Sequence, residues 1–403
     1  MRTIYADKVL PKMIAVKALG RIWPGVCWSP LSPTTVADLP DPPLPGPRWV
    51  RLKNHQCGIC ATDLSLLYVK VDPSVGPAAL PGNNRFYLGH EVVSTVVEIG
   101  PGVTRFKPGD RAIMDTRFHG ANCPSQEIDP PCASCARGER GLCENVSANI
   151  GPRGVGGGWG DGYTAHETEV YPVPTDLSDD LATLVEPMAV GLHAVLRHPP
   201  KSGDHILVLG CGIIGLLTLR VAQAVRPDCH ITALTRYPHQ AEVARRFGAD
   251  VVLTRSDGYA SIARVTGAKH YTAPMNKGML LGGFDVIYDC VGTGRTVEDS
   301  LRWARAGGVV VLVGIDLARS KVDLNQIWYQ EVDLIGSKGH GTDEWQGRRR
   351  HTYDWVIQLI GEGKLKGDGM ITHRFRFDEY QRAVATSLNK AQTRSIKVVF
   401  DYR

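Results

Sequence analysis

The chain has 403 residues, of which 43% are hydrophobic and 22% charged, and its formal net charge is +5. This length predicts two domains or one large one, and the composition is typical of a soluble globular protein. It has no apolar stretch of the roughly 18 residues that span a bilayer and no apolar signal-peptide core, so we expect a cytoplasmic protein. The basic run at 348–350 lacks interleaved aromatic side chains, which argues against nucleic acid as a partner.

The predicted elements follow two patterns along the chain. After a short extension over residues 1–12, short β-like runs alternate with proline and glycine turns up to about Leu181, which predicts a barrel-like β domain. From Leu181 onward helices and strands alternate, which predicts a parallel sheet with helices on both faces. After about residue 338 a long helix and short strands follow, and this tail could return to the first domain. The β-like runs are 13–19, 49–55, 92–100 and 111–115, with loops expected at 23–47, 72–87 and 268–280.

The alternating region contains a glycine-rich turn between an apolar strand, 205–210, and an amphipathic helix, 213–225. Gly210 permits the tight turn, Gly212 lets the backbone approach a pyrophosphate, and Gly215 lets the helix pack closely on the strand. The helix N-terminus adds free N–H groups and a positive dipole end for the anion. We therefore expect a dinucleotide-binding site. The turn consists of Gly210, Cys211, Gly212, Ile213, Ile214 and Gly215.

The next strand, 230–235, ends without the carboxylate that holds a ribose 2′-hydroxyl in NAD-binding proteins. Thr235 is neutral there, and Arg236 adds a cation that can form paired hydrogen bonds with a 2′-phosphate. Tyr237 could stack on the adenosine. We therefore expect NADP rather than NAD. Two alternatives remain, in which Arg236 faces solvent or in which Asp228 or Glu242 reaches the ribose.

The ten cysteines suggest metal binding or buried thiols rather than a disulfide framework. Cys123, Cys132, Cys135 and Cys143 form the pattern C-x8-C-x2-C-x7-C, which predicts a closed tetrahedral zinc site on one loop. Cys123 is the least certain of the four ligands because of its long spacing. The alternative is a set of free surface thiols, which would be exposed to oxidation.

A second candidate metal site draws its ligands from three distant segments. Cys60 offers a sulfur, His90 a nitrogen, and Glu91 and Glu186 offer carboxylate oxygens. This is the ligand set of a catalytic zinc that keeps one position for water or substrate.

These segments resemble the medium-chain zinc-dependent alcohol dehydrogenase family, especially its polyol and threonine dehydrogenase branch. The matching stretches run in the family's order over nearly the whole chain and include CGICATDL, GHEVVSTVVEIGPGVTRFKPGDRA, CASCARGERGLCENV, LVEPMAVGLHA, VLGCGIIGLL and SIKVVF. The family's usual spacing before the second structural cysteine is x2, so the x8 here is a departure.

The resemblance implies a role for several single residues. It implies that Cys60 and His90 are catalytic zinc ligands, and that Glu91 or Glu186 supplies the carboxylate. Thr62 would relay the substrate proton, and Asp63 would orient the histidine ligand. The residues that the resemblance places at the cofactor are Val291 and Gly292 and Val313, Gly314 and Ile315 at the nicotinamide, and Lys397 near the pyrophosphate.

The sequence thus predicts an α/β protein with two domains. A GroES-like β-barrel catalytic domain would comprise residues 1–184 and 339–403, and a Rossmann doubly wound domain residues 185–338. We expect a zinc-dependent oxidoreductase that transfers hydride between an alcohol or ketone and NADP(H). The alternatives are an NAD-dependent polyol or amino-alcohol dehydrogenase and a nicotinamide-binding redox sensor without turnover. The resemblance also implies a homo-oligomer, a dimer or a tetramer, acting on a small molecule.

Overall fold

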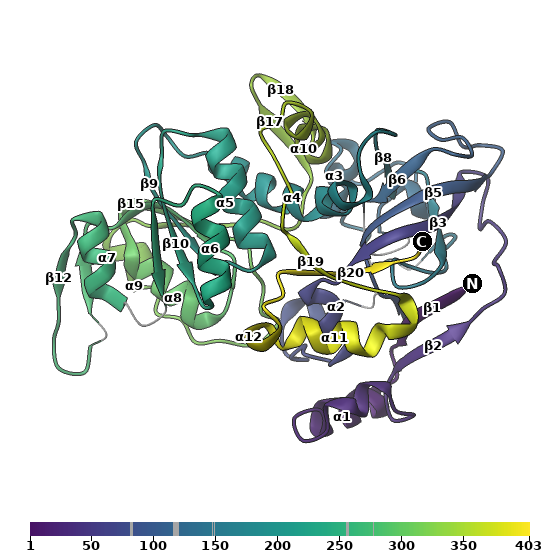
Figure 1. Ribbon diagram of the computed structural model, residues 1–403, viewed down its shortest axis with the longest axis horizontal. Helices are drawn as coiled ribbons and strands as arrows, with labels where there is room; N and C mark the ends of the chain where they lie inside the picture. The colour runs from purple at the N-terminus through teal and green to yellow at the C-terminus, as the bar shows by residue number, and fades with distance from the viewer. Residues whose placement is uncertain (81–83, 116–120, 147, 149, 255–257, 277) are drawn as a thin grey trace. The chain divides into compact units, whose positions relative to one another are not determined.

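The computed structural model describes residues 1–80, 84–115, 121–146, 148, 150–254, 258–276 and 278–403. Within these residues the chain forms two compact units, Met1–Glu186 with Gly367–Arg403, and Pro187–Lys366 (Figure 1). Among the described helices, none combines the length and the apolar character that crossing a membrane requires.

The first unit is built around a seven-stranded, mostly antiparallel sheet. Its central strand β3 pairs with β5, β7 and β20, so segments far apart in the chain meet on it. Residues 367–403 thus belong to this unit. The strands, in the order β19-β20-β3-β5-β6-β8 with β7 on β3, are β19 (Ile371–Phe375), β20 (Lys397–Asp401), β3 (Trp49–Gly58), β5 (Glu91–Ile99), β6 (Arg111–Met114), β8 (Val170–Pro172) and β7 (Gly162–His166).

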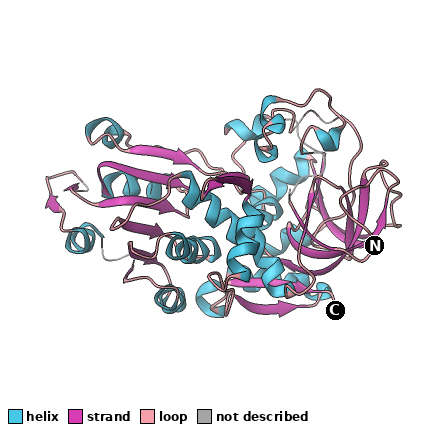
Figure 2. Cartoon of the chain, turned by 90° about the horizontal axis from the view of Figure 1, so that it is seen from above, coloured by secondary structure: helices cyan, strands magenta, loops and turns pink. Residues whose placement is uncertain are grey.

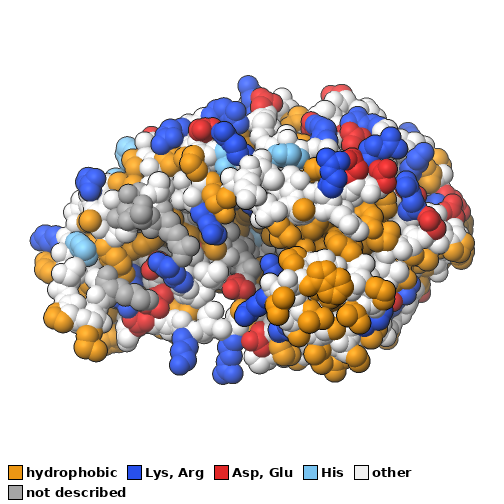
Figure 3. All heavy atoms as spheres, turned by 60° about the horizontal axis from the view of Figure 1, so that its bottom comes forward, with side chains coloured by type: hydrophobic (Ala, Val, Ile, Leu, Met, Phe, Trp, Pro, Cys, Tyr) orange, Lys and Arg blue, Asp and Glu red, His pale blue; other side chains and the backbone are white. Residues whose placement is uncertain are grey.

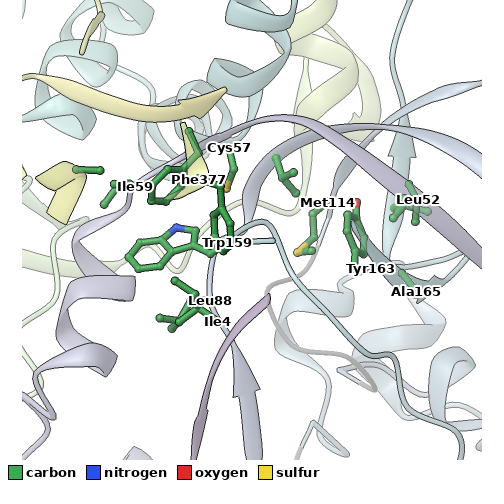
Figure 4. Close-up of a cluster of buried hydrophobic side chains, with 14 of the residues drawn as sticks. Ile4, Leu52, Cys57, Ile59, Leu88, Met114, Trp159, Tyr163, Ala165 and Phe377 are labelled. Atoms are coloured by element: carbon green, nitrogen blue, oxygen red, sulfur yellow. The ribbon is translucent and has the colours of Figure 1, made fainter. Parts of the chain in front are cut away.

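The core of the first unit lies against this sheet. Trp159 is fully buried and lies between Phe377 and Leu88 (Figure 4), and its ring meets that of Phe400 edge to face at 5.4 Å. Cys57 and Ile59, at the end of β3, belong to the same cluster. The residue that follows them, Cys60, is therefore attached to a packed and immobile strand end.

The N-terminal region differs from the sequence prediction. The expected extension 1–12 contains strand β1 (Arg2–Asp7), and the expected β-like run 13–19 is part of helix α1 (Leu10–Leu19). A proline in the first turn favours helix initiation, and Met13 and Val16, three residues apart, face the same apolar cluster. The expected loops contain β2 (Thr34–Asp38) and β4 (Arg85–Tyr87), which flank β1; residues 81–83 lie outside the described part of the chain.

The second unit contains a parallel sheet of six strands, as the alternating pattern predicts. The strand order reverses between β9 and β14, which creates the crevice where such folds bind dinucleotides. Apolar strands buried on both faces explain the continuous runs of valine, isoleucine and leucine. The strands, in the order β11-β10-β9-β14-β15-β16, are β11 (Val251–Thr254), β10 (His230–Thr235), β9 (His205–Leu209), β14 (Phe284–Asp289), β15 (Ala304–Leu312) and β16 (Asp333–Gly336).

Helices cover both faces of this sheet, α5 and α6 on one and α7, α8 and α9 on the other (Figures 1 and 2). Besides α1, the described helices of the two units are α2 (Ala61–Leu67), α3 (Ala133–Ala136), α4 (Asp179–Arg197), α5 (Ile213–Val225), α6 (Pro238–Arg246), α7 (Gly258–Thr266), α8 (Gly294–Trp303), α9 (Asn325–Tyr329), α10 (Thr352–Gly361), α11 (Tyr380–Leu388) and α12 (Lys390–Thr393). Short 3₁₀ turns are η1 (Pro24–Trp28), η2 (Gly76–Ala79), η3 (Pro124–Gln126), η4 (Arg140–Leu142) and η5 (Phe377–Glu379).

One further expectation for the second unit is corrected. Helix α8 ends at Trp303, and the following residues begin β15, where Gly307 has a φ of +65° that a helix does not accommodate. The loop expected at 268–280 contains a small hairpin of β12 (Lys269–Tyr271) and β13 (Met279–Leu281). A second hairpin joins β17 (Thr342–Trp345) to β18 (Arg348–His351).

Candidate active site and metal centres

The first candidate metal centre forms where the end of β3 lies beside the start of β5. Cys60 caps the N-terminus of α2 directly after β3, and His90 immediately precedes β5. Because Gly58 pairs with Glu91, the two strand ends meet. One donor atom each from Cys60, His90 and Glu91 lies within 4.8 Å of the others. A sulfur, a nitrogen and a carboxylate oxygen at this spacing fit zinc.

Asp63 holds the histidine of this group in place. Its carboxylate is buried, and Oδ1 lies 3.3 Å from His90 Nδ1. The same carboxylate accepts hydrogen bonds from the backbone N–H groups of Cys60, at 3.1 Å, and Gly89, at 3.2 Å. A carboxylate on one ring nitrogen fixes the tautomer of the imidazole and leaves the other nitrogen for a metal.

Lys397 is engaged by the candidate metal centre itself. Its Nζ lies 2.7 and 2.5 Å from the two carboxylate oxygens of Glu91, and both side chains are fully buried. Burial lowers the pKa of Lys397, but the attraction of Glu91 and Cys60 outweighs it and leaves the pKa raised. With its ammonium enclosed in this way, the geometry favours a role in holding Glu91 over the pyrophosphate contact that the resemblance implies.

A glycine that the sequence analysis did not single out makes room for this ion pair. A Cβ at Gly58 would lie 2.0 Å from Glu91 Oε2, so any side chain there would displace the carboxylate. Only the position of Gly58, two residues before the ligand Cys60, could have drawn attention to it.

Thr62 and Glu186 are the two remaining residues that the sequence analysis placed at the catalytic zinc. The Thr62 hydroxyl donates to Cys60 Sγ at 3.1 Å and is therefore beside the ligand group. Glu186 lies on α4, is half-buried, and its charge contributes to the raised pKa of Lys397. The ligand group among the described residues does not include Glu186, and Glu91 is the carboxylate that the structure brings to Cys60 and His90.

The second candidate metal centre gathers all four predicted cysteines, including Cys123. Cys123 Sγ and Cys143 Sγ are 3.7 Å apart, and Cys132 Sγ and Cys143 Sγ are 4.0 Å apart. A tetrahedron with zinc–sulfur bonds of about 2.3 Å has edges of about 3.8 Å. The spacing therefore fits four thiolates around one zinc and is too long for a disulfide.

Backbone N–H groups are directed at these sulfurs. Cys123 Sγ accepts from the N–H of Cys132, and Cys143 Sγ accepts from that of Asn145, both at 3.3 Å. Backbone hydrogen bonds lower the pKa of Cys132 to about 6, whereas burial raises the pKa of Cys135 to about 11. None of the ten cysteines, all of which lie among the described residues, forms a disulfide.

The glycine-rich turn in the second unit has the geometry of a pyrophosphate site. Gly210 has a φ of +91°, and a Cβ at Gly215 would lie 2.0 Å from the carbonyl oxygen of Gly210. A Cβ at Gly212 would meet no atom within 4 Å, so the space above the turn is open. Ile213 and Ile214 begin α5, whose N-terminus faces this space.

Asp289 organises the two loops that the resemblance places at the nicotinamide. Its Oδ1 accepts from the N–H groups of Val291 and Gly292 at 2.9 and 3.0 Å. Its carbonyl accepts from those of Val313 and Gly314 at 3.0 and 2.8 Å. Burial raises the pKa of Asp289. The sequence analysis missed this residue, although an acid at the end of an apolar strand is a recognisable signal.

The residues near the two ends of β10 differ in whether they could contact the ribose of a cofactor. Thr235 is buried, and its hydroxyl donates to the Leu253 carbonyl. Arg236 is exposed, with its guanidinium 5.3 Å from the ring centre of Tyr237. Asp228 precedes β10, at the end of the parallel strands opposite to Gly210, and is therefore too far away to reach the ribose.

Two family models match the chain. The alcohol dehydrogenase GroES-like domain matches residues 46–175, and the zinc-binding dehydrogenase matches residues 214–358. The chain belongs to the zinc-dependent medium-chain dehydrogenases, a family of enzymes, and its structure combines their GroES-like and Rossmann folds. Its relatives place it in the polyol branch. These matches do not favour the alternative of a nicotinamide-binding redox sensor without turnover.

Three relatives illustrate this placement. D-arabinitol dehydrogenase 1 of Uromyces fabae is 27% identical over 351 residues, 85% of this chain and 88% of that protein. (R,R)-butanediol dehydrogenase of Bacillus subtilis is 28% identical over 343 residues, 83% of this chain and 87% of that protein. The solved structure of a zinc-binding dehydrogenase from Sinorhizobium meliloti 1021, bound to NADP, is 26% identical with a TM-score of 0.70 and covers 99% of each chain.

Proposed function

We propose that the protein oxidises a polyol-type secondary alcohol, or reduces the matching ketone, with NADP(H). The observation that carries this proposal is the group of Cys60, His90 and Glu91 in a chain whose second unit has an open pyrophosphate turn. Cys60, His90 and Glu91 would hold a zinc ion that supplies Lewis-acid chemistry at the substrate oxygen, and a bound nicotinamide would supply the hydride chemistry. The names of the relatives in the polyol branch support this substrate class.

The side chains around the zinc ligands would divide the remaining work. Thr62, whose hydroxyl lies 3.1 Å from the ligand sulfur, accepts the substrate hydroxyl proton and passes it toward solvent. Asp63 keeps His90 in the ligating tautomer. Lys397 holds Glu91 as a carboxylate within reach of the metal, and Glu186 is the alternative carboxylate ligand.

The preference for NADP is supported by Arg236. Arg236 is exposed directly after β10, and this strand end has no carboxylate. The ring of Tyr237 lies under the guanidinium of Arg236. A guanidinium can form two hydrogen bonds with a 2′-phosphate, while a carboxylate would repel it. The NADP-bound structure of the Sinorhizobium relative is consistent with this choice. NAD is the alternative.

Three wider expectations belong to the same proposal. The catalytic domain would comprise 1–184 and 339–403 and the dinucleotide-binding domain 185–338. Four cysteines would hold a structural zinc, and Cys123 would be one of its ligands. The enzyme would act in the cytoplasm as a dimer or a tetramer.

An initial-rate panel tests the function. The zinc-replete protein is offered polyols, simple secondary alcohols, aldoses and amino alcohols, and the matching carbonyl compounds, each with NADP and NAD, while nicotinamide absorbance is followed. Turnover of polyols that prefers NADP supports the proposal. Turnover that prefers NAD contradicts the role of Arg236, and turnover confined to another class contradicts the substrate assignment.

A further inference from the structure

An apolar patch covers the outer face of α1 and the segment that follows it. Leu10 and Ile14, four residues apart on one face of the helix, are 67% and 59% exposed, and Ile22 and Trp23 are 85% and 48% exposed. We call these four residues the α1 patch. Figure 3, in which the side at the bottom of Figure 1 comes forward, shows hydrophobic side chains gathered in one area with charged side chains at its margin. Such a gathering marks a binding surface.

The helix that carries the patch is firmly attached to its unit. On its inner face, Val16 packs with Val26 and Val69, and Met13 contacts the same cluster. Lys17 Nζ also donates to the Val71 carbonyl at 2.9 Å. A helix that is apolar on more than one face is expected to be covered on each of them, and the described residues cover only the inner one. The segment also precedes both ranges matched by the family models.

The segment that carries the patch has charges of one sign. From Lys8 to Ala37 the chain has four basic residues and no acidic one. A second copy of this surface would bring like charges together, which disfavours self-association through it. An anionic partner would instead be attracted. The four basic residues are Lys8, Lys12, Lys17 and Arg21.

The patch also has no hydrogen-bond acceptors among its side chains. Residues 8–23 read KVLPKMIAVKALGRIW, with no hydroxyl, amide, carboxylate or imidazole group. A protein interface of standard size carries about ten hydrogen bonds, for which both donors and acceptors are needed. A lipid surface requires only apolar side chains for its acyl boundary and cations for its phosphates.

We propose that the α1 patch is a docking surface for anionic lipid bilayers. Leu10, Ile14, Ile22 and Trp23 enter the boundary between headgroups and acyl chains, and the exposed side chains of Lys8 and Arg21, which flank the helix, contact the lipid phosphates. The bound form lies on the membrane and does not span it. Because the apolar area is small, the attachment is reversible and weakens as salt screens the charges.

Vesicle co-sedimentation of the full chain tests this proposal. Vesicles of phosphatidylcholine containing phosphatidylglycerol should sediment the protein at physiological salt, and vesicles of phosphatidylcholine alone should not. The double variant Ile14→Ser/Ile22→Ser should bind at least about tenfold more weakly, and Lys8→Gln/Arg21→Gln should also lose binding. The matched control Val97→Ser changes an exposed apolar residue of β5 and should bind as the wild type does.

Other outcomes would overturn the proposal. The variants change exposed side chains that have no proposed part in catalysis, so unchanged turnover and melting temperature show that they are folded. Failure of the wild type to bind anionic vesicles, or equal binding to neutral ones, excludes anionic lipid as the partner. If the wild type does not bind vesicles and Ile14→Ser/Ile22→Ser lowers its oligomeric state, the patch is an interface between copies. Retention on an acidic protein without vesicle binding would assign it to a protein partner.

Discussion

Lys397 and Glu91 form a fully buried ion pair beside Cys60, although 306 residues separate them in the chain. They meet because β20 and β5 both pair with β3. Taking two charges out of water is costly, and the pair is tolerated because each charge neutralises the other. The pair therefore couples the stability of the first unit to the position of a candidate metal ligand.

Removal of one member should destabilise the protein strongly. We expect Lys397→Met to lower the free energy of unfolding by about 3–5 kcal/mol, because Glu91 is left buried without its countercharge. Urea unfolding followed by circular dichroism measures this loss. The double variant Lys397→Met/Glu91→Leu removes both charges and should recover most of the stability. A double variant as unstable as the single one would contradict the buried-pair interpretation.

The carboxylate ligand of the catalytic zinc can be identified by metal content. If Glu91 is the ligand, Glu91→Gln should lose the catalytic zinc, while Glu186→Gln should keep it. Inductively coupled plasma mass spectrometry on dialysed protein gives the zinc per chain. The reverse pattern would assign the site to Glu186, and loss in both variants would assign a ligand role to each.

The cysteine lobe should bind a second zinc that depends on Cys123. We expect Cys123→Ser to lower zinc content by one equivalent and to lower the melting temperature, because the lobe folds around its metal. Cys229→Ser is the matched control, since Cys229 is buried but lies outside the four-cysteine cluster. Full zinc content in Cys123→Ser would mean that three cysteines and another donor suffice.

Cofactor choice should depend on Arg236. We expect Arg236→Ala to raise KM for NADP about tenfold or more, which corresponds to about 1.4 kcal/mol, and to leave KM for NAD nearly unchanged. Arg245→Ala is the control, because Arg245 is an exposed arginine on the following helix α6. Equal effects on both cofactors would show that Arg236 does not contact a 2′-phosphate.

His166 should make stability depend on pH in the acidic range. Burial lowers its pKa from 6.5 to about 4, so between these values the unfolded chain binds a proton that the folded chain does not. Stability contributed by the neutral imidazole is therefore complete above about pH 6.5 and is lost as the pH falls toward 4. Urea unfolding at pH 7 and pH 5 measures the loss, which should be smaller in His166→Gln. An unchanged loss in that variant would place the titrating group elsewhere.

The sequence predicted the second unit well because its structure is determined locally. Each strand and helix has its own apolar period, and the glycines at 210, 212 and 215 are specified by contacts within a few residues. The N-terminal helix was mistaken for a β-like run because MIAVKAL contains β-branched residues, and only packing on Val26 and Val69 resolves this ambiguity.

The candidate active site was predicted in its ligands but not in its supports. Cys60, His90 and Asp63 are recognised from short motifs, whereas Gly58 and Lys397 act through pairing of distant strands. No local signal shows that the ammonium of Lys397 is enclosed with Glu91, because that depends on the register of β20 on β3. For the same reason the sequence could not choose between Glu91 and Glu186.

The first unit consists of two separate segments of the chain, and this has a consequence for its biosynthesis. The ribosome completes Met1–Glu186 before it makes Pro187–Lys366, and only afterwards does Lys397 emerge with β20. Until then β7 and β5 pair with β3, but the edge of Gln56–Gly58 that β20 will join is unpaired, and Glu91 has no buried countercharge. A nascent chain would therefore hold its metal-binding residues in an unfinished sheet through the whole synthesis of the second unit. Zinc insertion at Cys60 and His90 should be a late event in the maturation of the enzyme.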